Sequence, residues 1–209
     1  MIESDKAAKI FGHFREHCIR LKRDYNTYND LFNESSREVL SKTAPTFFAD
    51  IADILQRHWL LQACKLADPP ESKRKDGIHY NITVQLLNQA LERMGLLSPD
   101  ISNTGGAIVD YGEKLKPARD KYIAHFDYEH QVQGTLLGET SEPELLKFLD
   151  DIQQYCDLVG ETLGIGPLDF SFSGCTGDAL DLLMHLRRAE EKIQDTRQIQ
   201  RETIPDNRF

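Results

Sequence analysis

The fold class is decided by the stretch PTFFADIADILQRHWLLQACKL, residues 45–66. Its apolar residues recur at steps of three and four and cover a wide arc, a pattern typical of an α-helix that is buried on most sides. Pro45 suits the first turn of such a helix, and Pro69-Pro70 ends it. We expect a helix from about Thr46 to Leu66, and we expect it to be the most buried element of the fold.

Helical periodicity also dominates the rest of the 209-residue chain. No segment shows the alternation of strands and helices that is typical of βαβ units. The sequence therefore predicts an all-α fold, an up-down helical bundle with extra terminal helices. The other expected helices run from about Lys6 to Leu31, from Asn81 or Thr83 to Met94, from Ala107 to Phe126, from Ser141 to Leu163, and onward from Asp178.

Several helix ends carry local signals. Ser141 and Glu144 have the spacing of a capping box, in which the two residues satisfy each other's backbone N–H groups. Gly105-Gly106 is expected to interrupt the chain before the helix that begins near Ala107. Pro117 lies inside that helix, where it either begins a new helix or kinks a longer one.

Two segments are expected to lack helical structure. Residues 69–77 read as a loop that carries Lys73-Arg74-Lys75, the densest basic run of the chain. This run could grip a phosphate backbone, or it could simply be the basic part of a solvated loop. Residues 128–141 contain two glycines and are expected to form a loop or a short hairpin.

The composition is that of an ordinary globular protein, with 40% hydrophobic and 28% charged residues. The length suits one domain, so we expect residues 1–209 to form a single helical domain whose polar end, residues 190–209, frays. The net charge of −9 argues against a protein that coats nucleic acid with its whole surface, but it does not exclude a small basic site. The charged start and the lack of a long apolar run predict a cytoplasmic protein without membrane contact.

The four cysteines, Cys18, Cys64, Cys156 and Cys175, do not point to a metal site. None pairs at CxxC spacing, and no cluster of His and Cys has the spacing of zinc ligands, so we expect neither a metal nor a cofactor. Cys64 and Cys156 lie in apolar-periodic stretches and are expected to be buried free thiols.

The segment ARDKYIAHFD, which contains Arg119 and His125, has the residue types that metal-free RNA cleavage requires. Arginine is a permanent cation whose fork matches a phosphate, and histidine moves protons near neutral pH. Arg119 would hold the scissile phosphate and His125 would transfer protons. Asp120 or Asp127 could orient either side chain, and Lys121 and Asp127 are candidates for contact with RNA.

Spacing alone leaves a simpler interpretation open, in which Arg119 and Asp120 form a surface ion pair and His125 packs at a helix end. Six residues along a straight helix turn roughly 600° and rise about 9 Å, so Arg119 and His125 would not share a face. The pair suits catalysis better if the helix ends or bends, or if two copies meet across a two-fold axis. A second match to the spacing, from Arg74 to His79, contains Gly77 and is treated as coincidence.

Three blocks give the chain a resemblance to the abortive-infection, AbiU-like branch of the HEPN superfamily over most of its length. The third and most specific block has the Arg-x(4–6)-His signature with a polar residue after the arginine. In the second block the family pattern is Arg-Leu-Thr-Asp, whereas this chain has Lys65-Leu66-Ala67-Asp68. The difference leaves the roles of Lys65 and Asp68 open. The blocks are Tyr28-Asn29-Asp30-Leu31-Phe32; Pro45-Thr46-Phe47-Phe48 with Leu60-Leu61, Lys65-Leu66-Ala67-Asp68 and Asn81-Ile82-Thr83-Val84; and Arg119-Asp120-Lys121 through Ala124-His125-Phe126-Asp127.

The resemblance implies a core of four or five helices and a homodimer in which the Arg/His motifs of both subunits face one cleft. It implies catalytic roles for Arg119 and His125 and a supporting role for Asp120. Many HEPN proteins are metal-independent endoribonucleases that act as toxins or phage-defence effectors, with an RNA substrate and, in toxin–antitoxin pairs, a cognate antitoxin such as a nucleotidyltransferase. Others keep the fold and only bind a nucleotide or a partner protein, which is the alternative function.

Overall fold

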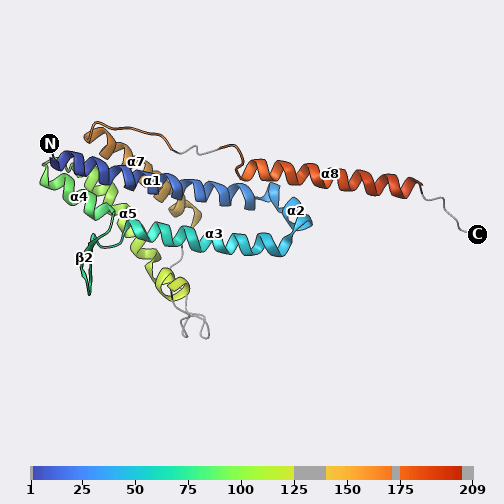
Figure 1. The fold of residues 1–209 in the computed structure, drawn as a ribbon, viewed down its shortest axis with the longest axis horizontal. Coiled ribbons are helices and arrows are strands. Elements are labelled where there is room, and N and C mark those ends of the chain that lie inside the picture. Colours follow the sequence, from blue (N-terminus) through green and yellow to red (C-terminus); the bar gives the residue numbers. More distant parts are fainter. Residues whose placement is uncertain (1, 125–139, 171–174, 204–209) are drawn as a thin grey trace, which may run out of the picture. The chain divides into compact units, whose positions relative to one another are not determined.

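The structure, a computed structural model, describes residues 2–124, 140–170 and 175–203. It confirms the all-α fold class, since the described residues contain only one small sheet beside the helices (Figure 1). The helices and strands are α1 (Ile2–Phe32), α2 (Glu34–Thr43), α3 (Pro45–Leu66), β1 (Glu71–Arg74), β2 (Gly77–Tyr80), α4 (Val84–Arg93), α5 (Pro99–Ala118), the π-helix η1 (Arg119–Ala124), α7 (Glu142–Thr162) and α8 (Ala179–Thr203).

Contacts group the chain into two compact units. The larger unit comprises Met1–Asp24 and Arg57–Ser173, and the smaller unit comprises Tyr25–Gln56 and Gly174–Phe209. Helices α1 and α3 each contribute residues to both units, since α1 passes through position 24 and α3 through position 56. Whether residues 1–209 behave as one domain stays a prediction.

The core of the larger unit forms where α5 packs against α7 and against α4 (Figure 1). Tyr155 of α7 is fully buried, with its ring edge-on to Phe14 of α1 at 5.5 Å between centroids. Its hydroxyl donates a hydrogen bond to Oδ1 of Asn88 in α4 at 2.7 Å, which satisfies the one polar atom of a buried ring. One aromatic side chain therefore joins three helices that are distant in sequence.

The smaller unit has its own apolar cluster, to which α2 and α8 contribute. Helix α2 begins after Asn33, whose side chain accepts a hydrogen bond from the backbone N–H of Ser36. The sequence reasoning missed α2, although an Asn at this position is a recognised start signal. The buried members of the cluster are Leu31, Val39, Leu40, Phe48, Ala179 and Leu183.

The bounds of α3, Pro45–Leu66, agree with the prediction, and Pro45 occupies its first position. The expectation that α3 is the most buried element is wrong. Phe47 is 57% exposed and Ile54 is 56% exposed, whereas α5 and α7 each bury a complete face. An apolar arc on a helix shows which residues can be buried, but the packing of the neighbouring helices decides which are.

The ends of α5 and α7 show how local signals compare with tertiary structure. The capping box of α7 is confirmed: Ser141 and Glu144 exchange hydrogen bonds. The expected interruption at Gly105-Gly106 is wrong, because α5 begins at Pro99 behind the N-cap Ser98 and runs through both glycines. Gly105 is instead a packing residue, since a Cβ there would lie 2.8 Å from Cγ1 of Val84.

The basic segment expected as a loop is largely an antiparallel hairpin. Glu71 pairs with Tyr80 and Arg74 pairs with Gly77, so the turn contains only Lys75 and Asp76. Gly77 has a φ of 136°, which favours glycine. The charged residues obscure the alternation that is typical of a strand, but the Asp76-Gly77 dipeptide is a known turn signal.

Helix α8 continues as far as Thr203, so the described part of residues 190–209 is helical; that this end frays stays a prediction. The expected loop at residues 128–141 lies outside the described residues except for its last two positions. Among the helices that are described, none combines the length and apolar character that a membrane-spanning helix requires.

Candidate functional site

The candidate site begins where α5 ends and η1 starts. Helix α5 runs through Pro117, and the π-helix begins two residues later at Arg119. Proline has no N–H to donate and its ring crowds the preceding turn. A π-helix is rare and is frequent at functional sites. Pro117 therefore neither begins a new helix nor ends the old one; the helix continues with a change of geometry at the predicted arginine.

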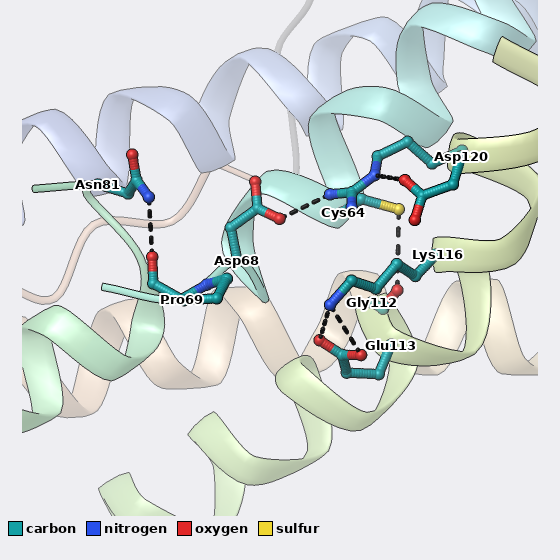
Figure 2. A network of polar contacts seen from close by, with 9 residues as sticks. Cys64, Asp68, Pro69, Asn81, Gly112, Glu113, Lys116 and Asp120 are labelled. Atoms are coloured by element: carbon teal, nitrogen blue, oxygen red, sulfur yellow. Dashed lines mark hydrogen bonds and ion pairs between the residues drawn. The ribbon is translucent and has the colours of Figure 1, made fainter. Parts of the chain in front are cut away.

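Arg119 is held by two carboxylates. Its Nη1 donates a hydrogen bond to Oδ1 of Asp68 at 2.6 Å, and its Nε donates one to Oδ1 of Asp120 at 2.8 Å. Figure 2 shows these carboxylates reaching the guanidinium from different sides. The side chain of Arg119 is 18% exposed, so the guanidinium is largely enclosed but remains open to solvent on part of its surface.

The two carboxylates also set the electrostatics of Arg119. Partial burial disfavours its charged form, but the hydrogen bonds and charges of Asp120 and Asp68 outweigh this effect and raise the pKa of Arg119 above its ordinary value. The guanidinium therefore stays a cation, as arginine does throughout proteins. The single positive charge of Arg119 faces the two negative charges of Asp68 and Asp120. The three residues together therefore carry a formal charge of −1.

Hydrogen bonds hold the backbone at Asp68 and at the residue that follows it. Helix α3 ends at Leu66, and the N–H of Asp68 donates to the carbonyl of Lys65 at 3.4 Å. After Asp68, the side-chain amide of Asn81 donates to the carbonyl of Pro69 at 2.8 Å, as Figure 2 shows. These bonds connect the segment that carries Asp68 to the segment that follows the hairpin.

Helices α3 and α5 approach closely beside the site. A Cβ on Gly112 would lie 2.4 Å from Cβ of Ala67, so only glycine fits there. Cys64 packs in the same contact, and its thiol donates to the carbonyl of Gly112 at 3.7 Å (Figure 2). Burial raises the pKa of the Cys64 thiol to about 11, although the positive charge of Arg119 acts in the opposite direction. Cys64 is therefore a protonated packing residue and a poor nucleophile.

Two nearby lysines of α5 are already paired with carboxylates. Lys116 lies 2.9 Å from Glu113, and Lys114 lies 2.6 Å from Glu144 of α7. Neither of these lysines is therefore an unpaired cation of α5. This arrangement agrees with the net charge of −9, which argues against a broad basic surface.

The structure brings together only part of the predicted site. Arg119 and Asp120 lie in contact, as expected, while His125 and Asp127 lie outside the described residues. Lys121 falls in η1 and is partly buried. A contact of Arg119 with RNA, proton transfer by His125 and RNA binding by Lys121 and Asp127 all stay predictions.

Sequence reasoning did not assign Asp68, although this residue, two positions after the end of α3, contacts Arg119. The available signal was its place in the Lys-Leu-Ala-Asp block, where the family pattern has Arg-Leu-Thr-Asp with the same final residue. The second spacing match falls on the hairpin: Arg74 ends β1, and His79 of β2 lies 3.0 Å from Asp76. That histidine pairs within its own hairpin, which fits the interpretation of coincidence.

The chain is all-α, and two carboxylates hold an arginine where the helix geometry changes. This arginine lies six residues before a histidine. These are features of a HEPN-type protein. The family described as AbiU2, of HEPN type, matches residues 4–174. Since the match spans more than half of the chain, the protein belongs to the AbiU2 family of the HEPN superfamily, and the predicted resemblance is confirmed. Neither a curated protein nor a solved structure matches the chain.

Proposed function

We propose that this AbiU2-family protein is a metal-independent endoribonuclease of the cytoplasm, active as a homodimer, that serves as a toxin or phage-defence effector. Arg119 would bind the scissile phosphate, and His125 from one or both subunits would transfer protons. Asp120 and Asp68 would position Arg119. The proposal is supported by family membership and, above all, by the state of the Arg119 side chain.

The supporting observation is that the guanidinium of Arg119 is held in place while some of its N–H donors have no partner. Arginine has five N–H donors, and Arg119 uses two of them toward Asp68 and Asp120. Among the described residues its Nη2 has no hydrogen-bond partner. Because the two carboxylates restrict the rotation of the side chain, a phosphate could bind at the remaining donors without paying the full cost of ordering an arginine.

The reaction would be an internal transesterification of RNA. A base removes the proton of a 2′-hydroxyl, and the 2′-oxygen forms a bond to phosphorus while the bond from phosphorus to the 5′-oxygen breaks. An acid then protonates the departing 5′-oxygen. The products are a 2′,3′-cyclic phosphate and a 5′-hydroxyl. Arg119 would stabilise the added negative charge on the phosphoryl oxygens, and the second subunit's copy of His125 would supply the second proton-transfer group.

The test is cleavage of RNA by the purified full-length protein in the presence of EDTA, with the new ends mapped. We expect Arg119→Ala to reduce the rate by about 10²-fold or more, and His125→Ala by about 10²- to 10⁴-fold. Arg188→Ala and His185→Ala serve as controls, because both residues are exposed on α8. Sedimentation checks the dimer. A folded dimer that leaves RNA intact, both alone and with its partner from a neighbouring gene, would refute the proposal.

The second candidate is a non-catalytic module that binds a nucleotide or a partner protein, and one observation favours it. The carboxylates of Asp68 and Asp120 outnumber the single charge of Arg119, which weakens its attraction for phosphate. In that case His125→Ala would leave the biological effect unchanged, while changes at the partner surface would abolish it. Protection of cells against phage by the wild type and by His125→Ala separates the two candidates.

A further inference from the structure

A cavity of about 580 Å³ lies between the first turns of α1, the β1–β2 hairpin and α4, all within the larger unit. Its volume falls in the range of small-molecule sites. Neither Arg119 nor its partners Asp68 and Asp120 line this cavity. Its apolar wall includes Ile10 of α1 and Leu86 of α4, and Ile82 lies at its edge with 43% of its surface exposed.

Two cations line the cavity from different helices, Lys6 of α1 and Arg93 of α4. Both side chains are exposed, and neither forms an ion pair within the described part of the chain. This distinguishes them from Lys114 and Lys116, each of which has a glutamate partner. With Glu71, which also lines the cavity, Lys6 and Arg93 give it a formal charge of +1 on a chain whose net charge is −9, so the cavity is a local site for an anion.

The hairpin contributes an aromatic ring and a carboxylate to the same cavity. Tyr80 is 65% exposed although it lines the cavity, so its ring is available to a ligand. Glu71 is the cross-strand partner of Tyr80 and therefore lies on the same face of the hairpin. Gln89 of α4 adds an amide that can both donate and accept hydrogen bonds.

We propose that this cavity binds a nucleotide, with the base stacked on Tyr80 and the phosphate held by Lys6 and Arg93. Stacking on a flat aromatic ring suits any base, and paired cations suit a phosphate. Glu71 and Gln89 then face the N–H and O–H groups of the base and sugar. An anion with an alkyl chain fits less well, because it would leave the carboxylate of Glu71 against hydrocarbon.

The nucleotide could be a free molecule or one unit of an RNA strand, and the hairpin bears on the choice. Lys73 is two residues from Glu71 on the same strand, so it lies on the same face as Glu71 and Tyr80. A strand whose nucleotide occupied the cavity would pass this lysine with its next phosphate. The inference does not depend on RNase activity, since binding here requires neither Arg119 nor His125.

The experiment measures binding to the full-length protein by calorimetry with adenosine 5′-monophosphate and by anisotropy with a labelled 2′-O-methyl oligoadenylate. The 2′-O-methyl group removes the nucleophile of the proposed reaction, so cleavage cannot affect the result. We expect Arg93→Ala to weaken binding about tenfold and Tyr80→Ala to weaken it about tenfold. Phe47→Ala and Arg188→Ala, which alter an equally exposed ring and an exposed arginine elsewhere, should leave it unchanged.

The outcomes separate the two sources of the nucleotide. If Lys73→Ala weakens binding of the oligonucleotide but not of the mononucleotide, the cavity receives RNA. If the mononucleotide binds and Lys73→Ala affects neither probe, the ligand is a free nucleotide. If neither probe binds up to millimolar concentration, or if Tyr80→Ala and Arg93→Ala bind as tightly as the two control variants, the inference is overturned whatever the outcome of the cleavage assay.

Discussion

The Nη1 atom of Arg119 lies 2.6 Å from Oδ1 of Asp68, a residue 51 positions earlier in the chain. This ion pair joins the end of α3 to the start of η1, two segments that no local interaction would bring together. Both partners are largely enclosed, with 18% and 30% of their side chains exposed. The solvent exposure of this pair is therefore intermediate between that of a surface ion pair and that of a fully buried one.

A double-mutant cycle should detect this pair as a positive coupling energy. We expect Asp68→Ala and Arg119→Ala to couple by about 1 kcal/mol in the free energy of unfolding, because the pair is charged, hydrogen-bonded and mostly shielded from water. Urea unfolding of the wild type, the two single variants and the double variant measures this energy. The pair of Lys42 and Glu38 on α2, in which both side chains are exposed, supplies the comparison, with a smaller coupling expected. Equal coupling in the two cycles would contradict the geometry.

The two glycines at positions 106 and 112 of α5 should respond to alanine in opposite directions. Gly112→Ala places a Cβ 2.4 Å from Cβ of Ala67, so the end of α3 and the turn that follows it must move away from α5, at a cost of about 1–3 kcal/mol in the free energy of unfolding. Gly106→Ala meets nothing within 4 Å in the same helix and should stabilise the protein by about 0.4–1 kcal/mol. Thermal and urea unfolding of both variants decide the matter, and a stabilised Gly112→Ala would show that the helices are not in contact.

Glu144 should make the stability of the protein depend on pH in the acid range. Hydrogen bonds from Lys114 and from Ser141 lower the pKa of Glu144 to about 2, from an ordinary value of 4.5. Because the folded-state pKa is the lower one, this contribution is fully present above about pH 4.5 and is lost as the pH falls toward 2. The difference in urea midpoint between the wild type and Glu144→Gln should therefore shrink between pH 6 and pH 2.5.

The control for the acid-range experiment is Glu142→Gln. Glu142 lies in the same first turn of α7 but makes no hydrogen bond with the described residues, so its removal should change the midpoint less at every pH. A midpoint difference for Glu144→Gln that stays constant from pH 6 to pH 2.5 would show that the carboxylate is not held by Lys114 and Ser141.

The four thiols should divide into one fast and three slow reactants. Cys18, Cys64 and Cys156 are buried free cysteines, which confirms the prediction for Cys64 and Cys156, while Cys175 is exposed. Burial raises the pKa of both Cys18 and Cys64, so little thiolate is present at neutral pH. Titration of the native protein with Ellman's reagent should show one rapid equivalent that Cys175→Ser removes, and three more only after unfolding. A second rapid equivalent would contradict the packing of α1, α3 and α7.

The sequence by itself determined the helices and several of their ends. Pro45 marks the first turn of α3, and Ser141 with Glu144 caps α7, because caps and prolines act through backbone atoms within one turn of the chain. Family membership could also be inferred from the sequence. The spacing between Arg119 and His125 along the chain does not depend on how the helices pack. Asp120 is the neighbour of Arg119 along the chain, so their contact needed no further information.

Tertiary structure decided which residues complete the site and which faces are buried. Asp68 meets Arg119 beside the close approach of Gly112 in α5 to Ala67, which directly follows α3, and this contact is invisible in either segment alone. The same holds for Phe47, which is apolar but exposed, and for Gly105, which packs rather than breaks a helix. Local propensity acts over a few residues, whereas burial and ion pairing between helices depend on atoms that folding brings together from distant parts of the chain.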